Sequence, residues 1–483
     1  MRKSVNARKL MASYRQVSRL KSSVTLGVDS LIEVFERGLR KDIESNGNIY
    51  KEVLMGPVEI CELLQLAAGQ SQNAIPSYLI PDSGLCRLTL SLSQRLIELL
   101  PALLVAREKC RLDIALSVYL NTIITSLGPL EASIPLLKPN DSIVVNTHFS
   151  QRCLRDMFDI PNGLIIVKPP IPELCRDARH AIEPSCLARS SNLRISCFSR
   201  ISPEKGIHEL IKALRHLPIE WTLHIYGFSE SHSIYEAYLI RLCQRLGLEN
   251  RIYFQQQVND KDKRLEALLL ADVVVNMSTS FEETMGKVIL EALSWDKPVV
   301  ANYWNGFADL LPGNELITTY WSSYDWYHVK ANDISQAIVR AYSMPSGRAE
   351  RLYREFLCMR EEDGKMAEYG ENVRVIPKHI EPDWKLLNDW VSHPRAMAMH
   401  HSPKLLRRYA AKIGGYFAPR TVVDRAEKIN ISDPLLHPRA IQVYCQNKQV
   451  SPLPYLRSWM RHGKDSPYAV IAESLIFELE AHL

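Results

Sequence analysis

The sequence lacks the features that would place its chain in a membrane, a disulfide framework or a zinc site. Its most apolar stretch, residues 88–106, is interrupted by Arg95, Glu98 and Pro101, so no run reaches the ~20 apolar residues that a bilayer span needs. The N-terminus is basic but has no apolar h-region, so a secretory signal is not expected. None of the ten cysteines forms a C-x-x-C pair, a pattern typical of reduced thiols. We therefore expect a cytoplasmic protein.

A large excess of charge of one sign is also missing. Lys plus Arg total 59 and Asp plus Glu total 54, and a net charge of +5 over 483 residues is too small to indicate a nucleic-acid partner. Neither G-x-S-x-G nor G-x-x-x-x-G-K-[ST] occurs, which argues against a hydrolase nucleophile elbow and a P-loop. Apolar residues make up 46% and charged residues 23%, which excludes a disordered or collagen-like chain.

The length predicts about three structural units. From residue 193, short strands rich in β-branched residues alternate with helices of about ten residues, which predicts βαβ crossovers and a buried parallel sheet. We expect a first α/β domain over residues 1–170, a linker over 171–192, a doubly wound domain over 193–345 and a mainly helical extension over 346–483. The expected strands and helices from residue 193 are RISCFSR, HELIKALRHL, WTLHIYG, IYEAYLIRLCQRLGL, RIYF, KRLEALLLA, VVVNM, GKVILEALSW and PVVAN.

The N-terminal half alternates less regularly. LSVYL is a short buried-strand candidate and DSIVVNTHFSQRCLRDMF is a strand followed by a helix, but the first strand has only KSSVTLG as a candidate. The first 28 residues hold seven Lys or Arg and no acid. They form a solvated helical face or a frayed terminus, or else they bind anionic lipid headgroups or a phosphorylated acceptor.

Two charged motifs follow strands of the second domain, at the edge where an open parallel sheet binds ligands. In SRISPEKG, Arg200 and Lys205 stand five apart before Gly206, which suits a diphosphate at a helix N-terminus, although both cations are alternatively just solvated. In SFEETMGKVILEAL, Glu283 and Glu291 stand eight apart, a little over two helical turns, so a ligand that crosses the helix start would meet a carboxylate at each end.

Two further turns at this edge are weaker candidates. In NYWNGFADLLP, Asn305 and Gly306 either approach the ligand or form an ordinary turn, and Asp309 is expected to cap the next helix. Gly227 ends the WTLHIYG strand, and backbone around Phe254–Val258 would frame a flat base or is ordinary loop.

Residues 193–311 resemble the nucleotide-sugar-binding domain of the family-four retaining glycosyltransferases (glycosyl transferases group 1), which have the GT-B fold. The matching stretches are SRISPEKGIHELIKAL, LGLENRIYF, LLLADVVVNMSTSFEETMGKVILEAL and KPVVANYWNGFADLL. The resemblance implies two Rossmann-like, doubly wound domains facing a cleft, with an acceptor-binding first domain and a nucleoside-diphosphate-sugar donor bound by the second. It therefore implies a hexosyltransferase-type enzyme.

The resemblance assigns roles to residues on the donor side. Arg200 and Lys205 would bind the donor diphosphate and stabilise the charge that grows on it as the glycosidic bond breaks, so neither a metal ion nor a cofactor is expected. Glu283 would contact the hydroxyls of the transferred sugar. The resemblance also places Glu291 at the ribose and the backbone N–H groups of Met285 and Gly286 at the sugar or phosphate. Gly227 and Val258 complete the donor-binding candidates because of their places after strands.

The sequence also departs from the family's pattern. Thr284–Met285 replaces the usual Gly-Phe before the motif glycine, and Gly27 is the only glycine where the first domain normally has a Gly-rich loop. Tyr119 and Asn121 stand where a histidine often lies near the reacting carbon, and His148 follows a strand that would border the cleft. These four positions, Gly27, Tyr119, Asn121 and His148, are the acceptor-side candidates.

The acceptor is expected to be a glycan, a lipid-linked molecule or a small molecule, and the basic N-terminus suggests peripheral contact with the inner face of a membrane. The alternatives are a non-catalytic GT-B-like protein that binds nucleotide sugar or a partner, and a nucleotide-sugar epimerase. His393, His400 and His401 are not expected to bind a metal, because Pro394 breaks any helix that would align them. Trp384, Trp390 and Trp459 would pack the extension against the main body or form an acceptor platform.

Overall fold

A computed structural model of the chain has two compact units. Unit 1 comprises residues 1–168 and 363–406, and unit 2 comprises residues 169–362 and 407–483. The residues that the structure describes are 53–54, 86–92, 100–109, 114–120, 127–139, 141–158, 160, 164–177, 192–228, 234–255, 258, 260–280, 283–322, 326–370, 382–385, 387, 437–447, 450–463 and 465–480. The predicted first strand, the basic N-terminal segment, Trp390 and the three histidines of residues 393–401 lie outside them.

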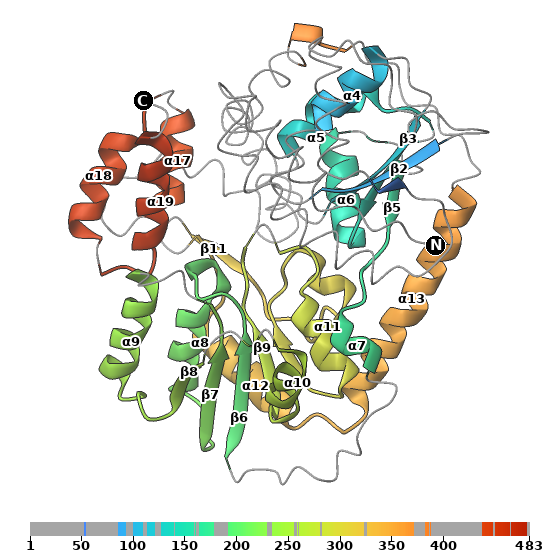
Figure 1. The fold of residues 1–483 in the computed structure, drawn as a ribbon. Helices are drawn as coiled ribbons and strands as arrows, with labels where there is room; N and C mark the ends of the chain where they lie inside the picture. Colours follow the sequence, from blue (N-terminus) through green and yellow to red (C-terminus); the bar gives the residue numbers. More distant parts are fainter. Residues whose placement is uncertain are drawn as a thin grey trace, which may run out of the picture. The chain divides into compact units, whose positions relative to one another are not determined.

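Unit 1 contains a parallel five-stranded sheet whose strands follow one another in chain order, β1-β2-β3-β4-β5 (Figure 1). Strands β3 and β4 confirm the LSVYL and DSIVV expectations, whereas β2 and β5 lie in stretches for which no strand was predicted. The elements are β1 (Val53–Leu54), β2 (Cys86–Leu92), α4 (Leu100–Lys109), β3 (Ile114–Leu120), α5 (Leu127–Ser133), the 3₁₀ helix η4 (Ile134–Leu136), β4 (Ser142–Val145), α6 (His148–Phe158) and β5 (Ile165–Val167).

Unit 2 contains a second parallel five-stranded sheet, in the order β10-β9-β6-β7-β8. All nine strands and helices expected between residues 193 and 301 are present, because each apolar strand is followed by an amphipathic helix of the right length. The elements are β6 (Leu193–Phe198), η8 (Pro203–Lys205), α8 (Ile207–Leu214), β7 (Trp221–Tyr226), α9 (Ile234–Leu246), β8 (Ile252–Gln255), α10 (Lys261–Leu269), β9 (Val273–Asn276), α11 (Lys287–Ser294) and β10 (Val299–Ala301).

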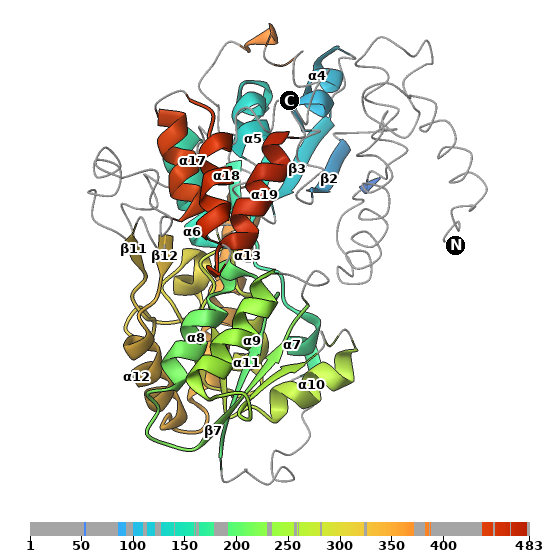
Figure 2. The ribbon, with the colours of Figure 1, turned by 90° about the vertical axis from the view of Figure 1, so that its left-hand side faces the viewer.

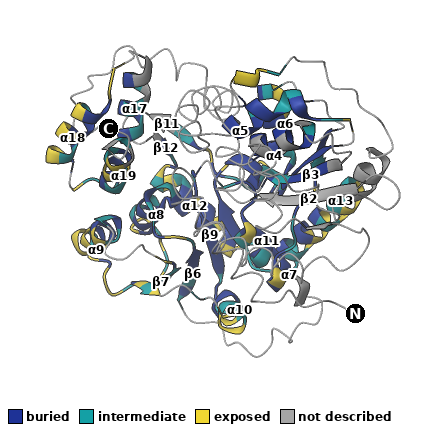
Figure 3. Ribbon diagram, turned by 45° about the horizontal axis from the view of Figure 1, so that its top comes forward, coloured by how far each residue is buried: buried dark blue, intermediate teal, exposed yellow. Residues whose placement is uncertain are grey.

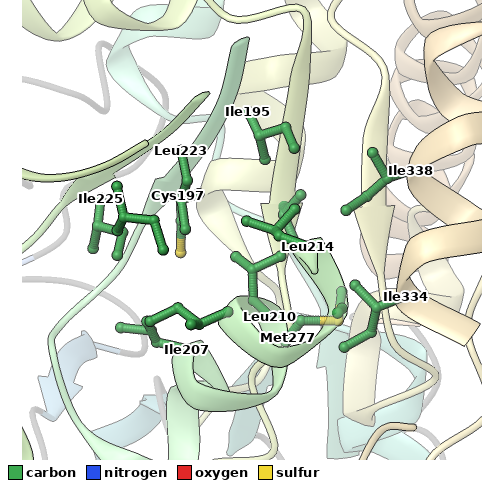
Figure 4. Close-up of a cluster of buried hydrophobic side chains, with 14 of the residues drawn as sticks. Ile195, Cys197, Ile207, Leu210, Leu214, Leu223, Ile225, Met277, Ile334 and Ile338 are labelled. Atoms are coloured by element: carbon green, nitrogen blue, oxygen red, sulfur yellow. The ribbon is translucent and has the colours of Figure 1, made fainter. Parts of the chain in front are cut away.

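The core of unit 2 lies between this sheet and the helices α8, α9 and α12 (Ala331–Tyr342). In Figure 4, Ile195 and Cys197 of β6 and Leu223 and Ile225 of β7 gather with α8 and α12 side chains. All four residues of β9 are buried, as expected for a central strand covered on both faces. Figure 3 shows the complementary pattern on α9 and α10, whose outer faces are exposed.

Two local expectations need correction. The predicted linker 171–192 begins with a helix, α7 (Glu173–Asp177), which packs against α11 and accepts a hydrogen bond from Trp295 Nε1 at the carbonyl of Leu174 (3.1 Å). Asp309 does not cap a following α-helix, because it is the last residue of the 3₁₀ helix η9 (Asn305–Asp309), which precedes the β11–β12 hairpin. The hairpin strands are β11 (Tyr320–Ser322) and β12 (Trp326–His328).

The C-terminal extension is helical in its described parts. Helix α13 (Arg348–Gly370) begins in unit 2, and its residues from Asp363 onward belong to unit 1. The last three helices pack around a core that includes Trp459, and they lie side by side in Figures 1 and 2. Trp459 is thus part of the extension's own core, whereas the expectation placed it between the extension and the main body. These helices are α17 (Pro438–Asn447), α18 (Leu453–His462) and α19 (Ala469–Glu480).

A buried aromatic cluster joins these helices to the rest of unit 2. His208 Nδ1 lies 2.8 Å from the Tyr235 hydroxyl, which links α8 to α9. The Tyr468 ring packs edge-on to His208, with ring centroids 5.7 Å apart, and also packs against His437 at 4.4 Å. Burial lowers the pKa of His437 well below its ordinary value, so this ring is neutral in the folded protein.

Candidate functional site

The charged motifs of unit 2 meet where the strand order reverses. Strand β6 pairs with β7 on one side and with β9 on the other, and β6 and β9 are both parallel to their neighbours. Their carboxyl ends therefore lie at the same edge, so the loops that carry Lys205 and Glu283 are neighbours. Ligands bind at such a switch point because two loops and two helix N-termini converge there.

Lys205 and Glu283 form the central ion pair of this edge. Lys205 Nζ lies 2.6 Å from Glu283 Oε2 and 3.3 Å from Ser278 Oγ. The two side chains are only 10% and 21% exposed, so little water screens the pair. The charge of Lys205 also affects Cys197 of β6. Burial raises the pKa of the Cys197 thiol, while the hydrogen bond with Ser199 and the charge of Lys205 oppose that rise.

Arg200 lies farther out. Its side chain is 55% exposed, and Nη2 is 3.7 Å from Glu204 Oε1. Glu204 itself accepts a 2.6 Å hydrogen bond from the Ser202 hydroxyl. The structure thus brings Lys205 and Glu283, from two separate motifs, together, and it leaves the guanidinium of Arg200 at the rim of the loop.

The loop after β9 is fixed by groups from two other elements. Thr279 donates its backbone N–H to the carbonyl of Glu204 at 2.7 Å, which ties the loop to η8. From the turn after β10, Trp304 Nε1 donates to the Ser280 carbonyl at 2.7 Å and Asn305 Nδ2 donates to the Glu283 carbonyl at 2.6 Å. The side chain of Asn305 therefore helps to hold Glu283 in place.

Helix α11 begins at this loop, with Gly286 as its N-cap. Gly286 has φ +74°, and a Cβ there would lie 2.6 Å from Phe307 Cε1, so both conformation and space require glycine. Met285 is buried, with 3% of the residue exposed. The start of α11 thus places backbone N–H groups and the positive end of the helix dipole beside Glu283.

Glu291, in the second turn of α11, is bound to a residue that the sequence did not single out. Arg264 Nη2 lies 2.6 Å and Nε lies 3.2 Å from Glu291 Oε2. The guanidinium carbon of Arg264 lies 5.6 Å from the centroid of the Phe198 ring, and that ring stacks on Tyr226 at 4.8 Å. Glu291 thus lies at the carboxyl end of the sheet with its charge already compensated.

The other predicted donor-side positions also follow strands. Gly227 directly follows β7, and a Cβ there would lie 2.3 Å from the carbonyl oxygen of Ser199, so a larger residue would displace the loop that carries Arg200. Val258 is half-buried between β8 and α10.

On the acceptor side, the structure describes two of the four predicted positions. Tyr119, in β3, has the ammonium of Lys168 at 5.8 Å from its ring centroid. His148, the first residue of α6, has Nε2 at 3.1 Å from Asp363 Oδ2 of α13. Gly27 and Asn121 lie outside the described residues. Among the residues described, no group of three or more His, Cys, Asp or Glu is placed to hold a metal ion, and no helix is long and apolar enough to cross a bilayer.

Residues 183–338 match the family model of the glycosyl transferases group 1. The match covers the whole Lys205–Glu283–Glu291 region. With the two parallel sheets, it confirms the predicted α/β GT-B fold class. It also confirms the predicted enzyme class, a nucleotide-sugar glycosyltransferase. No curated protein sequence matches the chain.

Several solved structures are similar to this chain. HepE of Anabaena, solved in complex with UDP, is 19% identical, with 65% of this chain and 82% of that chain covered and a TM-score of 0.45. A glycosyltransferase of Rickettsia africae is 16% identical, with 78% and 88% covered and a TM-score of 0.44. An α,α-trehalose 6-phosphate synthase of Burkholderia multivorans is 13% identical, with 72% and 75% covered and a TM-score of 0.46.

Sequence reasoning missed Arg264 and Trp304. Arg264 is four residues after Asp260, the N-cap of α10, so its position near the start of a helix that follows a strand was the available signal. Trp304 is fully buried, and its indole N–H donates into the loop after β9, a contact that no local pattern encodes.

Proposed function

We propose that this protein transfers a sugar from a nucleoside diphosphate to an acceptor, with retention of configuration at the anomeric carbon and without a metal ion. The observation that carries the proposal is the largely buried Lys205–Glu283 ion pair at the β6–β9 switch point. In this proposal Lys205 binds the donor diphosphate, and Glu283 beside it binds the sugar. Retention is proposed from the resemblance of these motifs to the family-four enzymes.

Lys205 would stabilise the departing nucleoside diphosphate. Negative charge grows on the diphosphate as the glycosidic bond breaks, and a preorganised ammonium with little exposure to water stabilises that charge strongly. The exposed guanidinium of Arg200 would close on the diphosphate from the rim and add a planar, bidentate donor. Two cations in these places supply the charge compensation that a divalent metal ion provides elsewhere.

Glu283 would bind hydroxyls of the transferred sugar. Its carbonyl is held by Asn305 and its carboxylate by Lys205, so its position is fixed before the donor arrives. When the diphosphate attracts Lys205, the Glu283 carboxylate gains the freedom to accept hydrogen bonds from the sugar. The start of α11, with Met285 and Gly286, would add backbone N–H donors.

The acceptor would bind to unit 1, and we propose a glycan, a lipid-linked molecule or a small molecule. Tyr119 and His148 are the described acceptor-side candidates, both at or beyond the carboxyl ends of strands. A cytoplasmic location with peripheral contact at the inner face of a membrane, through the basic N-terminal segment, is part of the same proposal.

The test is an assay of nucleoside diphosphate release. Purified protein is incubated with UDP-, GDP- and ADP-sugars and acceptor extracts, with and without a metal chelator, and the anomeric configuration of the product is determined by NMR. We expect acceptor-dependent release that survives the chelator. Lys205→Ala should lower kcat by about 100- to 1,000-fold, and Glu283→Gln should also lower it strongly. Lys212→Ala, which removes a more exposed lysine of α8 paired with Glu209, is the matched control and should retain activity.

The same assay separates the alternatives. Donor binding without diphosphate release from any donor and acceptor would refute transfer and favour a non-catalytic binding protein. An altered sugar stereocentre without an acceptor product would indicate an epimerase. An inverted anomeric configuration would refute retention while leaving transfer intact.

A further inference from the structure

The pair formed by Arg264 and Glu291 carries an inference that rests on the proposed function and goes beyond it. Glu291 is 12% exposed and Arg264 is 27% exposed, so both charges are largely removed from water. Both hydrogen bonds from the guanidinium end on the same carboxylate oxygen, Oε2. Among the described residues, nothing donates a hydrogen bond to Oε1, so half of the carboxylate is held and half is open.

The guanidinium is itself held in place. Its carbon lies 5.6 Å from the centroid of the Phe198 ring, and Phe198 is 7% exposed and stacked on Tyr226. A planar guanidinium over an aromatic face is favourable and restricts the side chain. Phe198 is the last residue of β6, the strand that leads directly to the loop carrying Lys205. The arrangement therefore fixes Oε1 of Glu291 relative to the diphosphate-binding loop.

We propose that Arg264 is a positioning residue of the donor site, which holds Glu291 in one orientation so that its second oxygen accepts hydrogen bonds from the ribose hydroxyls. A carboxylate without this partner would lose the charge compensation and would rotate about its side-chain bonds. Ordering it would then cost free energy when the nucleotide binds. Because Arg264 orders Glu291 before the nucleotide binds, it removes that cost. Its contribution is measured as the preference for a nucleotide with ribose hydroxyls over one without them.

The chain contains a close internal control for this geometry. Arg251 Nη2 also lies 2.6 Å from a glutamate oxygen, Oε2 of Glu220, and its guanidinium carbon lies 5.4 Å from the centroid of the Trp221 ring. Arg251 immediately precedes β8 and Glu220 immediately precedes β7, so this pair lies at the amino ends of the strands. It is the same kind of ion pair with the same kind of ring contact, made through one hydrogen bond and more exposed (39% and 66%), at the edge opposite to the proposed donor site.

The test measures binding of nucleotides with and without ribose hydroxyls to the full chain. Isothermal titration gives the affinity of the preferred nucleoside diphosphate and of its 2′,3′-dideoxy analogue for the native protein, Arg264→Ala, Arg264→Lys and Arg251→Ala. We expect the native protein to prefer the ribonucleotide by about tenfold or more. Arg264→Ala should lose most of this preference, Arg264→Lys should recover part of it, and Arg251→Ala should retain it.

A second arm tests whether Arg264 acts through Glu291. In a Glu291→Gln background, Arg264→Ala should cause no further loss of ribose preference. A general loss of folding would lower the affinity for both nucleotides equally. The ratio of the two affinities, rather than either affinity alone, therefore reports positioning. Thermal unfolding of each variant without nucleotide shows whether it is folded.

The outcomes separate the two proposals. If the native protein binds no nucleoside diphosphate, the proposed function fails and the positioning role fails with it. If it binds nucleotide but does not distinguish the dideoxy analogue, or if Arg264→Ala keeps the full preference, the positioning role is wrong while the proposed function stands. An increased ribose preference in Arg264→Ala would also overturn the role, because it would show that the ion pair competes with the ribose.

Discussion

The buried ion pair between Arg107 and Asp141 in unit 1 allows a quantitative prediction for Asp141→Ala. Arg107 Nη1 donates to both carboxylate oxygens, at 2.8 and 3.0 Å, and Nη2 donates to the Leu136 carbonyl at 2.6 Å. The Asp141 carboxylate also accepts backbone N–H groups of Leu116 and Lys138, each at 2.7 Å. One carboxylate thus connects α4, β3 and the turn before β4.

The magnitude follows from burial. Arg107 is 2% exposed and Asp141 is 4% exposed, so removal of the carboxylate leaves a buried guanidinium whose remaining ion pair is the longer one with Glu108, at 3.7 Å. Breaking a buried pair from one side costs about 3–5 kcal/mol of unfolding free energy. The two backbone N–H groups that lose their acceptor lie in the same network, so their loss is included in that range rather than added to it.

The assay is urea-dependent amide hydrogen exchange, followed by mass spectrometry on peptides from β3 and β4, because these report unit 1 by itself. Asp141→Ala should lower the unfolding free energy that these peptides report by about 3–5 kcal/mol. Lys138→Ala is the matched control, since it keeps the backbone N–H and removes only an ion pair with Glu108 at 3.1 Å. Both of those side chains are about a third exposed or more, so we expect a loss below about 1 kcal/mol.

A double variant distinguishes the loss of the Asp141 counter-charge from a general packing loss. Arg107→Met with Asp141→Asn removes both charges and keeps an acceptor for the N–H of Leu116, so it should be less destabilising than Asp141→Ala alone. A loss below 1 kcal/mol for Asp141→Ala, or a double variant less stable than the single one, would refute this account of the pair.

Two further predictions concern unit 2. Gly286→Ala should destabilise it by about 2–4 kcal/mol in urea titration, because φ is +74° and the new Cβ meets Phe307; Phe307→Leu in the same chain should recover part of that loss, and no recovery would count against the contact. The low pKa of the neutral, buried His437 predicts that stability is lost as pH falls below its unfolded value near 6.5, by up to about 1.4 kcal/mol per pH unit, and that this loss is absent above it. His437→Asn, which keeps an acceptor for the N–H of Arg439, should flatten this slope between pH 6.5 and 5, whereas substitution of the exposed His216 should leave it unchanged.

The sequence predicted the strands and helices between residues 193 and 301 well, because short-range periodicity defines them. Strand β9 is a continuous apolar run and α11 has an apolar stripe, and neither pattern depends on distant residues. Strand β2, Cys86–Leu92, was missed although Leu88, Leu90 and Leu92 alternate with polar residues, so the period-two signal was present there.

The charged donor-side residues that the sequence singled out lie in two motifs that follow strands of the second sheet. Lys205 and Glu283 were assigned from loops that follow strands, and the sheet order brings them together. Arg264 and Glu291 are 27 positions apart and lie on two different helices. The geometry of their contact depends on how both helices pack on the sheet. Short sequence patterns do not encode that packing, so the partner of Glu291 could be found only in the structure.

The division of the chain between the two units has a consequence for synthesis and for recombination. Unit 1 needs residues 363–406 as well as residues 1–168, so a chain made from its N-terminus cannot complete this unit until all of residues 169–362 have been synthesised. A fragment that ends at residue 362 would lack Asp363, the partner of His148. Exchange of one unit with that of a related enzyme therefore requires three junctions, after residues 168, 362 and 406, rather than one.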